Sequence, residues 1–83
     1  HQSQIAGEAL AYFQKLYIIE RELTELEHDD RRRLRQEQAK PVLDEFESWL
    51  KGRRQQVPNG SATAKAIDYS LRRWAALVQY LHD

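Results

Sequence analysis

Apolar residues recur along the first part of the chain with the spacing of an amphipathic helix. They are separated alternately by four and three residues, which is a seven-residue repeat with one apolar seam. Leu10, Phe13 and Tyr17 lie beside this seam and widen it. A widened stripe suits a helix in a bundle better than a two-stranded zipper. The pattern predicts a helix over residues 4–25.

The second segment begins with two acidic residues and contains a proline. Asp29 and Asp30 favour a helix start, because carboxylates complement the partial positive charge of the unpaired first amides. Pro41 lacks an amide hydrogen, so either one helix is kinked there or one helix ends just before it and another begins. We favour one kinked helix over residues 28–57, since no Gly, Asn or Ser marks a stop near Pro41.

A loop and a third helical segment complete the pattern. Pro58, Asn59 and Gly60 are turn residues, and Ser61 can cap a helix over residues 62–82. Short links make neighbouring helices antiparallel. We therefore predict an all-α fold, either an antiparallel up-down-up three-helix bundle or a long helical hairpin that takes its third partner from elsewhere. The residues expected in the core are Tyr12, Leu16, Phe46, Trp49, Leu50, Leu71, Trp74 and Val78, with Phe13 and Tyr17 as further bulky fillers.

The composition indicates one small domain over residues 1–83. The chain has no cysteine, which excludes disulfides and thiolate zinc sites and fits a reducing compartment. No apolar run is long enough to span a membrane, and we expect no membrane partner. The chain starts at His1 rather than Met, and a helical pattern is still running at Asp83. We expect a fragment of a longer protein.

Charge is balanced overall, with 13 basic and 13 acidic residues, but it is unevenly distributed. The first 30 residues are mainly acidic and the middle of the chain is mainly basic. One interpretation is a stripe that contacts nucleic-acid phosphates. Its candidate DNA-contacting residues are Arg31, Arg32, Arg33, Arg35 and Lys40, with Arg72 and Arg73 as a second group. The other interpretation, which we favour for the isolated domain, is a solvated face that pairs with Glu20, Glu22, Glu25 and Glu27.

Few residues suggest catalysis or metal binding. Glu25 and His28 have the Glu-x-x-His spacing of di-iron bundles, but only one copy is present, so His28 is better explained as a turn residue. Asp44, Glu45 and Glu47 are better explained as the polar face of a helix than as a magnesium site. There is no Gly-rich phosphate loop. We therefore expect no enzyme activity, metal or cofactor in this chain alone.

Three tracts resemble the helical part of the insertion-sequence 66 family of bacterial transposases. Residues 16–22 read Leu-Tyr-Ile-Ile-Glu-Arg-Glu, and residues 35–41 read Arg-Gln-Glu-Gln-Ala-Lys-Pro, which is the most specific tract. Residues 64–81 match a Lys-Ala-Ile-x-Tyr…Trp…Leu…Tyr-Leu pattern. The resemblance covers nearly the whole chain.

The resemblance implies a parent of the Asp-Asp-Glu type with an RNase-H-like core. There, two ions of Mg²⁺ or Mn²⁺, held by three carboxylates, activate a water and then a DNA 3′ hydroxyl. In the family, the matching helical segment follows the second catalytic aspartate and precedes an Asn-Asn-x-x-Glu-Arg motif, which this sequence lacks. No catalytic role passes to Asp29, Asp30, Asp44, Asp68 or Asp83.

The resemblance thus implies a helical insertion fragment of a cut-and-paste DNA transposase of the bacterial cytoplasm. Its expected role is structural, subunit-pairing or DNA-guiding. The expected partners are the rest of the transposase chain, DNA in the parent, and a second copy in a homodimer. The alternative is a stand-alone helical module for protein–protein interaction or self-association.

Overall fold

The computed structural model describes residues 2–82 of the chain and the side chains of residues 4–82. Its elements in chain order are the helices α1 (Gln2–Leu23), α2 (His28–Arg54), α3 (Ala62–Arg72) and α4 (Trp74–Gln79), and the 3₁₀ turn η1 (Tyr80–His82). The described residues contain no strand. The prediction of an all-α fold is confirmed.

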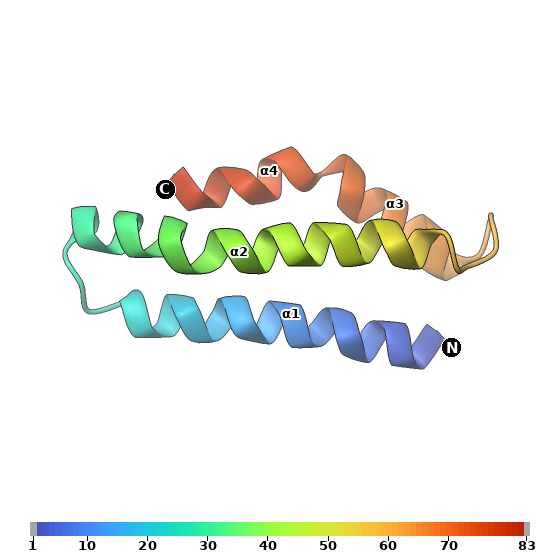
Figure 1. Ribbon diagram of the computed structural model, residues 1–83, viewed down its shortest axis with the longest axis horizontal. Coiled ribbons are helices and arrows are strands. Elements are labelled where there is room, and N and C mark those ends of the chain that lie inside the picture. Colours follow the sequence, from blue (N-terminus) through green and yellow to red (C-terminus); the bar gives the residue numbers. More distant parts are fainter. Residues whose placement is uncertain (1, 83) are drawn as a thin grey trace.

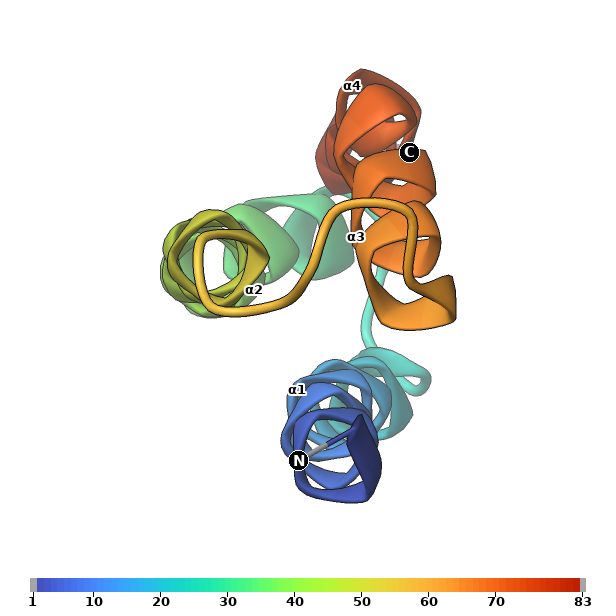
Figure 2. The same ribbon diagram turned by 90° about the vertical axis from the view of Figure 1, so that its right-hand side faces the viewer.

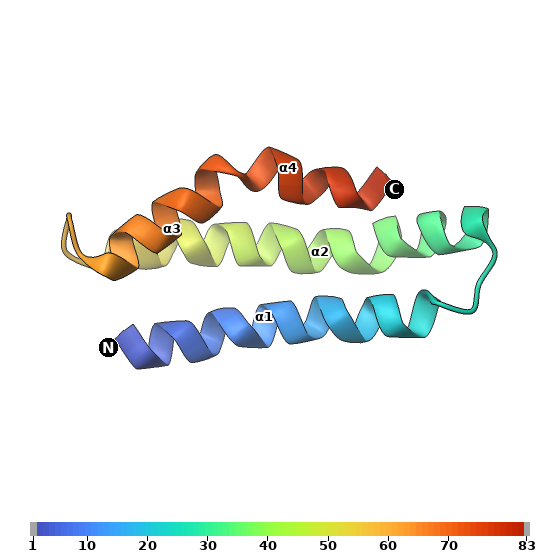
Figure 3. The same cartoon turned by 180° about the vertical axis from the view of Figure 1, so that it is seen from behind.

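The helices form an elongated molecule in which α2 is central. α1 and α2 run antiparallel, and α3, α4 and η1 return along α2 (Figure 1). The view from behind shows the start of α1 at the same end as the loop between α2 and α3 (Figure 3). α2 makes the main contacts with α1 and also packs against α3 and η1, while close approaches between α1 and α3 or α4 are few. Two helix pairs therefore share α2.

α2 runs without interruption through Pro41. Pro41 removes one amide donor, which leaves the carbonyl of Glu37 without its helical partner. Both residues are exposed, so water can hydrate that carbonyl. The prediction of one helix is confirmed, and the alternative of two helices is wrong. α2 ends at Arg54, three residues earlier than predicted.

The prediction of one helix over residues 62–82 is wrong, because the helix is interrupted at Arg73. This residue has φ −97° and ψ 10°, and its amide is shared between the carbonyls of Tyr69 and Ser70, at 3.2 Å each. The Ser70 hydroxyl donates to the carbonyl of Ala66 at 3.0 Å, a back-bond that often bends helices. α4 then starts in a new direction at Trp74, whose side chain is buried (Figure 1).

The loop before α3 matches the sequence pattern. Gly60 has φ +83°, a left-handed conformation that glycine adopts without strain. The Ser61 hydroxyl accepts from the Ala64 amide at 3.1 Å, so Ser61 is the N-cap of α3. At the opposite end, the first turn of α2 carries Asp29 and Asp30, as predicted.

The core lies along α2 and is rich in aromatic rings. Phe46 stacks on Tyr12 with ring centroids 4.8 Å apart, and meets Trp74 edge-on at 5.6 Å. All eight residues predicted for the core are in it, four buried and four partly buried against them. The prediction that Phe13 and Tyr17 fill the core is wrong, because they remain 49% and 67% exposed. Tyr17 points away from α2, whereas the half-exposed ring of Phe13 still meets Phe46 of α2 edge-on, with centroids 5.2 Å apart.

Candidate nucleic-acid interface

Arg35, a candidate for DNA contact, is instead part of the interior. The residue is 8% exposed, and its guanidinium binds Glu20 of α1 through two hydrogen bonds of 2.9 Å. A third guanidinium nitrogen donates to the carbonyl of Tyr80 at 3.4 Å, and the Tyr80 ring lies 5.2 Å from the guanidinium. Arg35 therefore ties α1, α2 and η1 together, and the expectation that it contacts DNA is corrected.

Tyr80 completes this network from the end of the chain. Its hydroxyl donates to Glu20 at 3.1 Å. Burial, together with the negative charge of Glu20, raises the pKa of Tyr80 to about 12, against a smaller opposing effect of Arg35. The phenol is therefore a stable hydrogen-bond donor at neutral pH. It is not a candidate for acid–base chemistry near pH 7.

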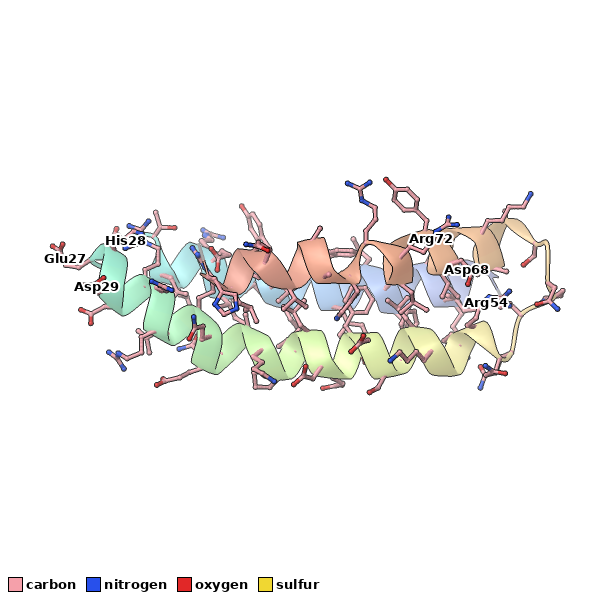
Figure 4. The ribbon with its side chains drawn as sticks, turned by 90° about the horizontal axis from the view of Figure 1, so that it is seen from above. Glu27, His28, Asp29, Arg54, Asp68 and Arg72 are labelled. Carbon is pink, nitrogen blue, oxygen red and sulfur yellow. The ribbon has the colours of Figure 1, made fainter. Side chains whose placement is uncertain are left out.

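Two more arginines of α2 also form ion pairs between helices. Arg53 binds Glu8 of α1, and Arg54 donates to Asp68 of α3 at 2.8 Å. Figure 4 shows Arg54 and Asp68 close to each other near the loop that joins α2 and α3. With Arg35, these residues explain part of the uneven charge distribution. The basic residues of α2 meet acidic residues of the helices on either side of it.

The remaining candidates on α2 are mostly engaged within or beside their own helix. Arg33 lies 3.4 Å from Asp30 and 3.7 Å from Glu37, and Lys40 lies 2.8 Å from Asp44. Arg31 donates to the carbonyl of Leu26 at 2.9 Å and fastens the link between α1 and α2. The ion pairs of Arg33 and Lys40 are exposed and screened by solvent, so these two side chains can still exchange their partners for a phosphate.

Three of the predicted cations are exposed and have no ion pair among the described residues, namely Arg32, Arg72 and Arg73. The structure brings together only the last two. They lie where α3 meets α4, and Arg72 is labelled on that segment in Figure 4. Arg32 lies in the first turns of α2, at the other end of the molecule from the loop before α3. The predicted basic residues therefore do not form one continuous stripe.

The sequence reasoning missed Tyr69 as a part of this surface. The residue is 56% exposed, and the guanidinium of Arg73 lies 5.3 Å from the centroid of its ring. A tyrosine four residues before an arginine on a helix was a readable signal, because residues at this spacing share a face. Tyr69, Arg72 and Arg73 form the surface that we call the α3 cation cluster.

The acidic groups considered for metal binding form no ligand cluster within the described residues. The side chains of residues 4–82 contain no group of three or more His, Asp or Glu that could hold a metal ion. His28 lies 3.7 Å from Asp29, and both side chains are largely exposed. Figure 4 shows Glu27, His28 and Asp29 together at the link between α1 and α2.

The comparison with known protein families agrees with the sequence resemblance. The family described as "Transposase IS66 family" matches residues 1–83. The chain belongs to the IS66 family of transposases. The resemblance of the three sequence tracts to this family is thereby confirmed.

Two curated proteins of Sinorhizobium fredii (strain NBRC 101917 / NGR234) are similar to this IS66-family chain. The uncharacterized protein y4hP is 36% identical over 81 residues, which cover 98% of the chain and 15% of the relative. The uncharacterized protein y4jD is 33% identical over 78 residues, with 94% and 15% coverage. The chain thus spans about 15% of the length of these relatives. No solved structure matches the chain.

Among the described residues of the IS66-family chain, no helix is both long enough and apolar enough to cross a bilayer.

Proposed function

We propose that this chain is a non-catalytic helical insertion of a DNA transposase and that it guides DNA alongside the catalytic core. Family membership supports the transposase part of the proposal. In the proposed parent, an Asp-Asp-Glu core with Mg²⁺ or Mn²⁺ performs cut-and-paste transposition, and the carboxylates of this chain take no part in it. The chain works in the bacterial cytoplasm, with the rest of the transposase and DNA as partners.

The observation that carries the DNA-guiding role is the α3 cation cluster. Most arginines of α2 form ion pairs or hydrogen bonds to backbone carbonyls. Arg72 and Arg73, by contrast, are exposed and have no ion pair within the described residues. Arginines gain affinity for DNA by displacing counterions from phosphates. The exposed ring of Tyr69 adds a surface on which an unpaired base can stack.

The test uses the intact transposase that carries this segment. Charge reversal in the double variant Arg72→Glu/Arg73→Glu should weaken binding to transposon-end DNA in an anisotropy titration. The slope of log affinity against log salt should fall by about two, since about two phosphate contacts are lost. Lys51→Glu is the matched control, because Lys51 is an exposed cation that is paired with Glu47 and is not a candidate for DNA contact. Unchanged affinity and slope in the double variant would exclude the DNA-guiding role.

A second candidate role is subunit pairing within the transposase. The observation that favours it is the outward face of α1, where Leu10, Phe13 and Tyr17 are exposed although the helix is otherwise well packed on α2. Large exposed apolar side chains that cluster on one face often mark an interaction surface. The two surfaces adjoin, because Phe13 lines the same hollow as Tyr69 and Arg73 of the α3 cation cluster.

A further inference from the structure

A hollow of about 330 Å³ at the junction of α3 and α4 is lined mainly by aromatic side chains. Phe46 and Trp74 are buried and form its floor, whereas Phe13 of α1 and Tyr69 of α3 are about half exposed at its sides. Viewed along the long axis, α1 lies apart from α3 and α4, and the hollow lies between them (Figure 2). We call it the aromatic hollow. Its volume is at the lower end of that of small-molecule sites, roughly 300–1,000 Å³.

The floor of the aromatic hollow is held by contacts between rings. Phe46 meets Phe13 edge-on with ring centroids 5.2 Å apart, and it meets Trp74 edge-on at 5.6 Å. On its other side, Phe46 stacks on Tyr12 at 4.8 Å. Rings that pack against one another in this way do not rearrange freely. The hollow therefore needs little ordering when a flat apolar ligand enters it.

Arg73 gives the aromatic hollow a cationic rim. Among the described residues that line the hollow, Arg73 alone is charged, and it is exposed and without an ion pair in the described part of the chain. Its guanidinium lies 5.3 Å from the centroid of the Tyr69 ring, which holds the cation beside the aromatic wall. The interruption of the helix places two successive residues differently, because Arg73 is exposed at the rim and Trp74 is buried in the floor.

A neighbouring hollow of about 460 Å³ shares Phe13 and Phe46 but differs in charge. The described residues that line it include no charged side chain. A ligand with a flat apolar group next to an anionic group therefore matches the aromatic hollow and not its neighbour.

We propose that the aromatic hollow takes one unpaired nucleobase of DNA, with the adjoining backbone phosphate on Arg73. This inference rests on the DNA-guiding role proposed above and names the form of DNA that the chain recognises. A nucleotide has a flat π-face and an anionic phosphate close together, which are the two features that the hollow matches. Aromatic side chains stack on every base, so the site tolerates different sequences. A paired base is enclosed in the double helix, so the site favours a base that is already unpaired.

The test measures binding of the 83-residue chain to two labelled DNA duplexes by fluorescence anisotropy at fixed salt. One duplex carries a single bulged adenine, and the other carries an abasic site in the same position. Both have the same number of phosphates, so the ratio of their dissociation constants isolates the contribution of the base. The chain should bind the bulged duplex at least about fivefold more tightly, which is the low end of the effect of base stacking on an aromatic side chain.

Two pairs of variants locate the base on the protein. Tyr69→Ala removes a wall of the aromatic hollow and should bring the ratio toward one, whereas Tyr17→Ala should not, because Tyr17 is 67% exposed on α1 and does not line this hollow. Ala76→Leu fills part of the hollow and should also lower the ratio. Ala75→Leu is its control, since both alanines are exposed on α4 and only Ala76 lines the hollow. Circular dichroism should show the same helix content in all four variants.

Several results would overturn the proposal. A ratio of one for the wild-type chain would do so, and so would the absence of binding to either duplex. A ratio that Tyr69→Ala and Ala76→Leu leave unchanged would also overturn it, as would equal effects of their two controls. If sedimentation shows a dimer that Ala76→Leu dissociates, the hollow accommodates a protein partner and the proposal is likewise overturned.

The DNA-guiding role has a separate readout, which is the effect of Arg72→Glu/Arg73→Glu on binding of transposon-end DNA by the intact transposase. A ratio of one together with a loss of affinity in that double variant would exclude the base site and keep the DNA-guiding role. Unchanged affinity in the double variant would exclude both.

Discussion

α1 carries two apolar seams of similar spacing: the inner seam of Ala9, Tyr12, Leu16 and Ile19, which packs into the core, and the outer seam of Ala6, Leu10, Phe13 and Tyr17. Leu16 on the inner seam is 9% exposed and packs against α2, whereas Leu10 on the outer seam is 56% exposed. Both leucines are on one continuous helix, so helix formation alone does not separate them. The difference teaches that heptad spacing identifies the faces of a helix that can pack against another helix. Whether that neighbour belongs to the same chain depends on where the other helices lie.

The largest expected effect tests this difference with one substitution at two places. Leu16→Ala should lower the free energy of unfolding by about 3 kcal/mol, because it removes buried methyl groups and leaves a cavity. Leu10→Ala should cost less than about 1 kcal/mol in the monomer, since its side chain is mostly hydrated already. Urea denaturation at a protein concentration where the chain is monomeric measures both.

The pair of variants controls itself, because helix propensity changes equally at both sites. Equal losses of stability would mean that Leu10 is as well buried as Leu16. The difference in burial between the two seams would then be disproved. A larger loss for Leu10→Ala at high protein concentration only would locate its contribution in subunit pairing.

The sequence predicted the helices and the inner seam well, because both follow from local spacing. The loop at Gly60, the cap at Ser61 and the core position of Trp74 needed no knowledge of distant residues. The interruption at Arg73 was missed. No Pro or Gly marks it, and the back-bond of Ser70 is one of several options open to a serine in a helix.

The candidate site was less predictable, because its charges find partners far away in sequence. Arg35 lies within a run of arginines and has the appearance of a surface cation, but its carboxylate partner Glu20 is 15 residues earlier and its aromatic partner Tyr80 is 45 residues later. Arg72 and Arg73 have no such partners among the described residues. The same residue type therefore serves either the interior or the surface, and only the tertiary fold decides which.

The second prediction sharpens the comparison at the closed end of the inner seam, where Arg35 fastens α1 to α2. Arg35→Met should lower the free energy of unfolding by about 2 kcal/mol, because Glu20 and the Tyr80 carbonyl lose their partly buried hydrogen-bond partner. This lies below the usual range for a buried pair, since Glu20 keeps part of its hydration. Thermal and urea denaturation measure the loss.

Arg33→Met is the matched control, because Arg33 is on the same helix in exposed, screened ion pairs. It should change stability by less than about 0.5 kcal/mol. If Arg33→Met were the more damaging variant, the assignment of Arg35 to the interior and Arg33 to the surface would be reversed.

The smallest expected effect concerns Tyr80 at high pH. Its pKa in the folded chain is raised to about 12 by burial and by Glu20, from the ordinary value of 10.0. A raised pKa means that the folded state holds the proton more tightly than the unfolded state. The stabilisation from Tyr80 is therefore complete below about pH 10, and is lost as the pH rises through about 12.

Ultraviolet titration of the phenolate, compared between the wild-type chain and Tyr80→Phe, isolates this one group from the other tyrosines. The difference curve should have its midpoint well above that of a free tyrosine. Glu20→Gln should move the midpoint down, because it removes the nearby negative charge, yet leave part of the rise, because burial is the larger cause. A difference curve centred at the ordinary pKa would show that η1 does not hold Tyr80 against Glu20. The contact between η1 and α1 would then be absent.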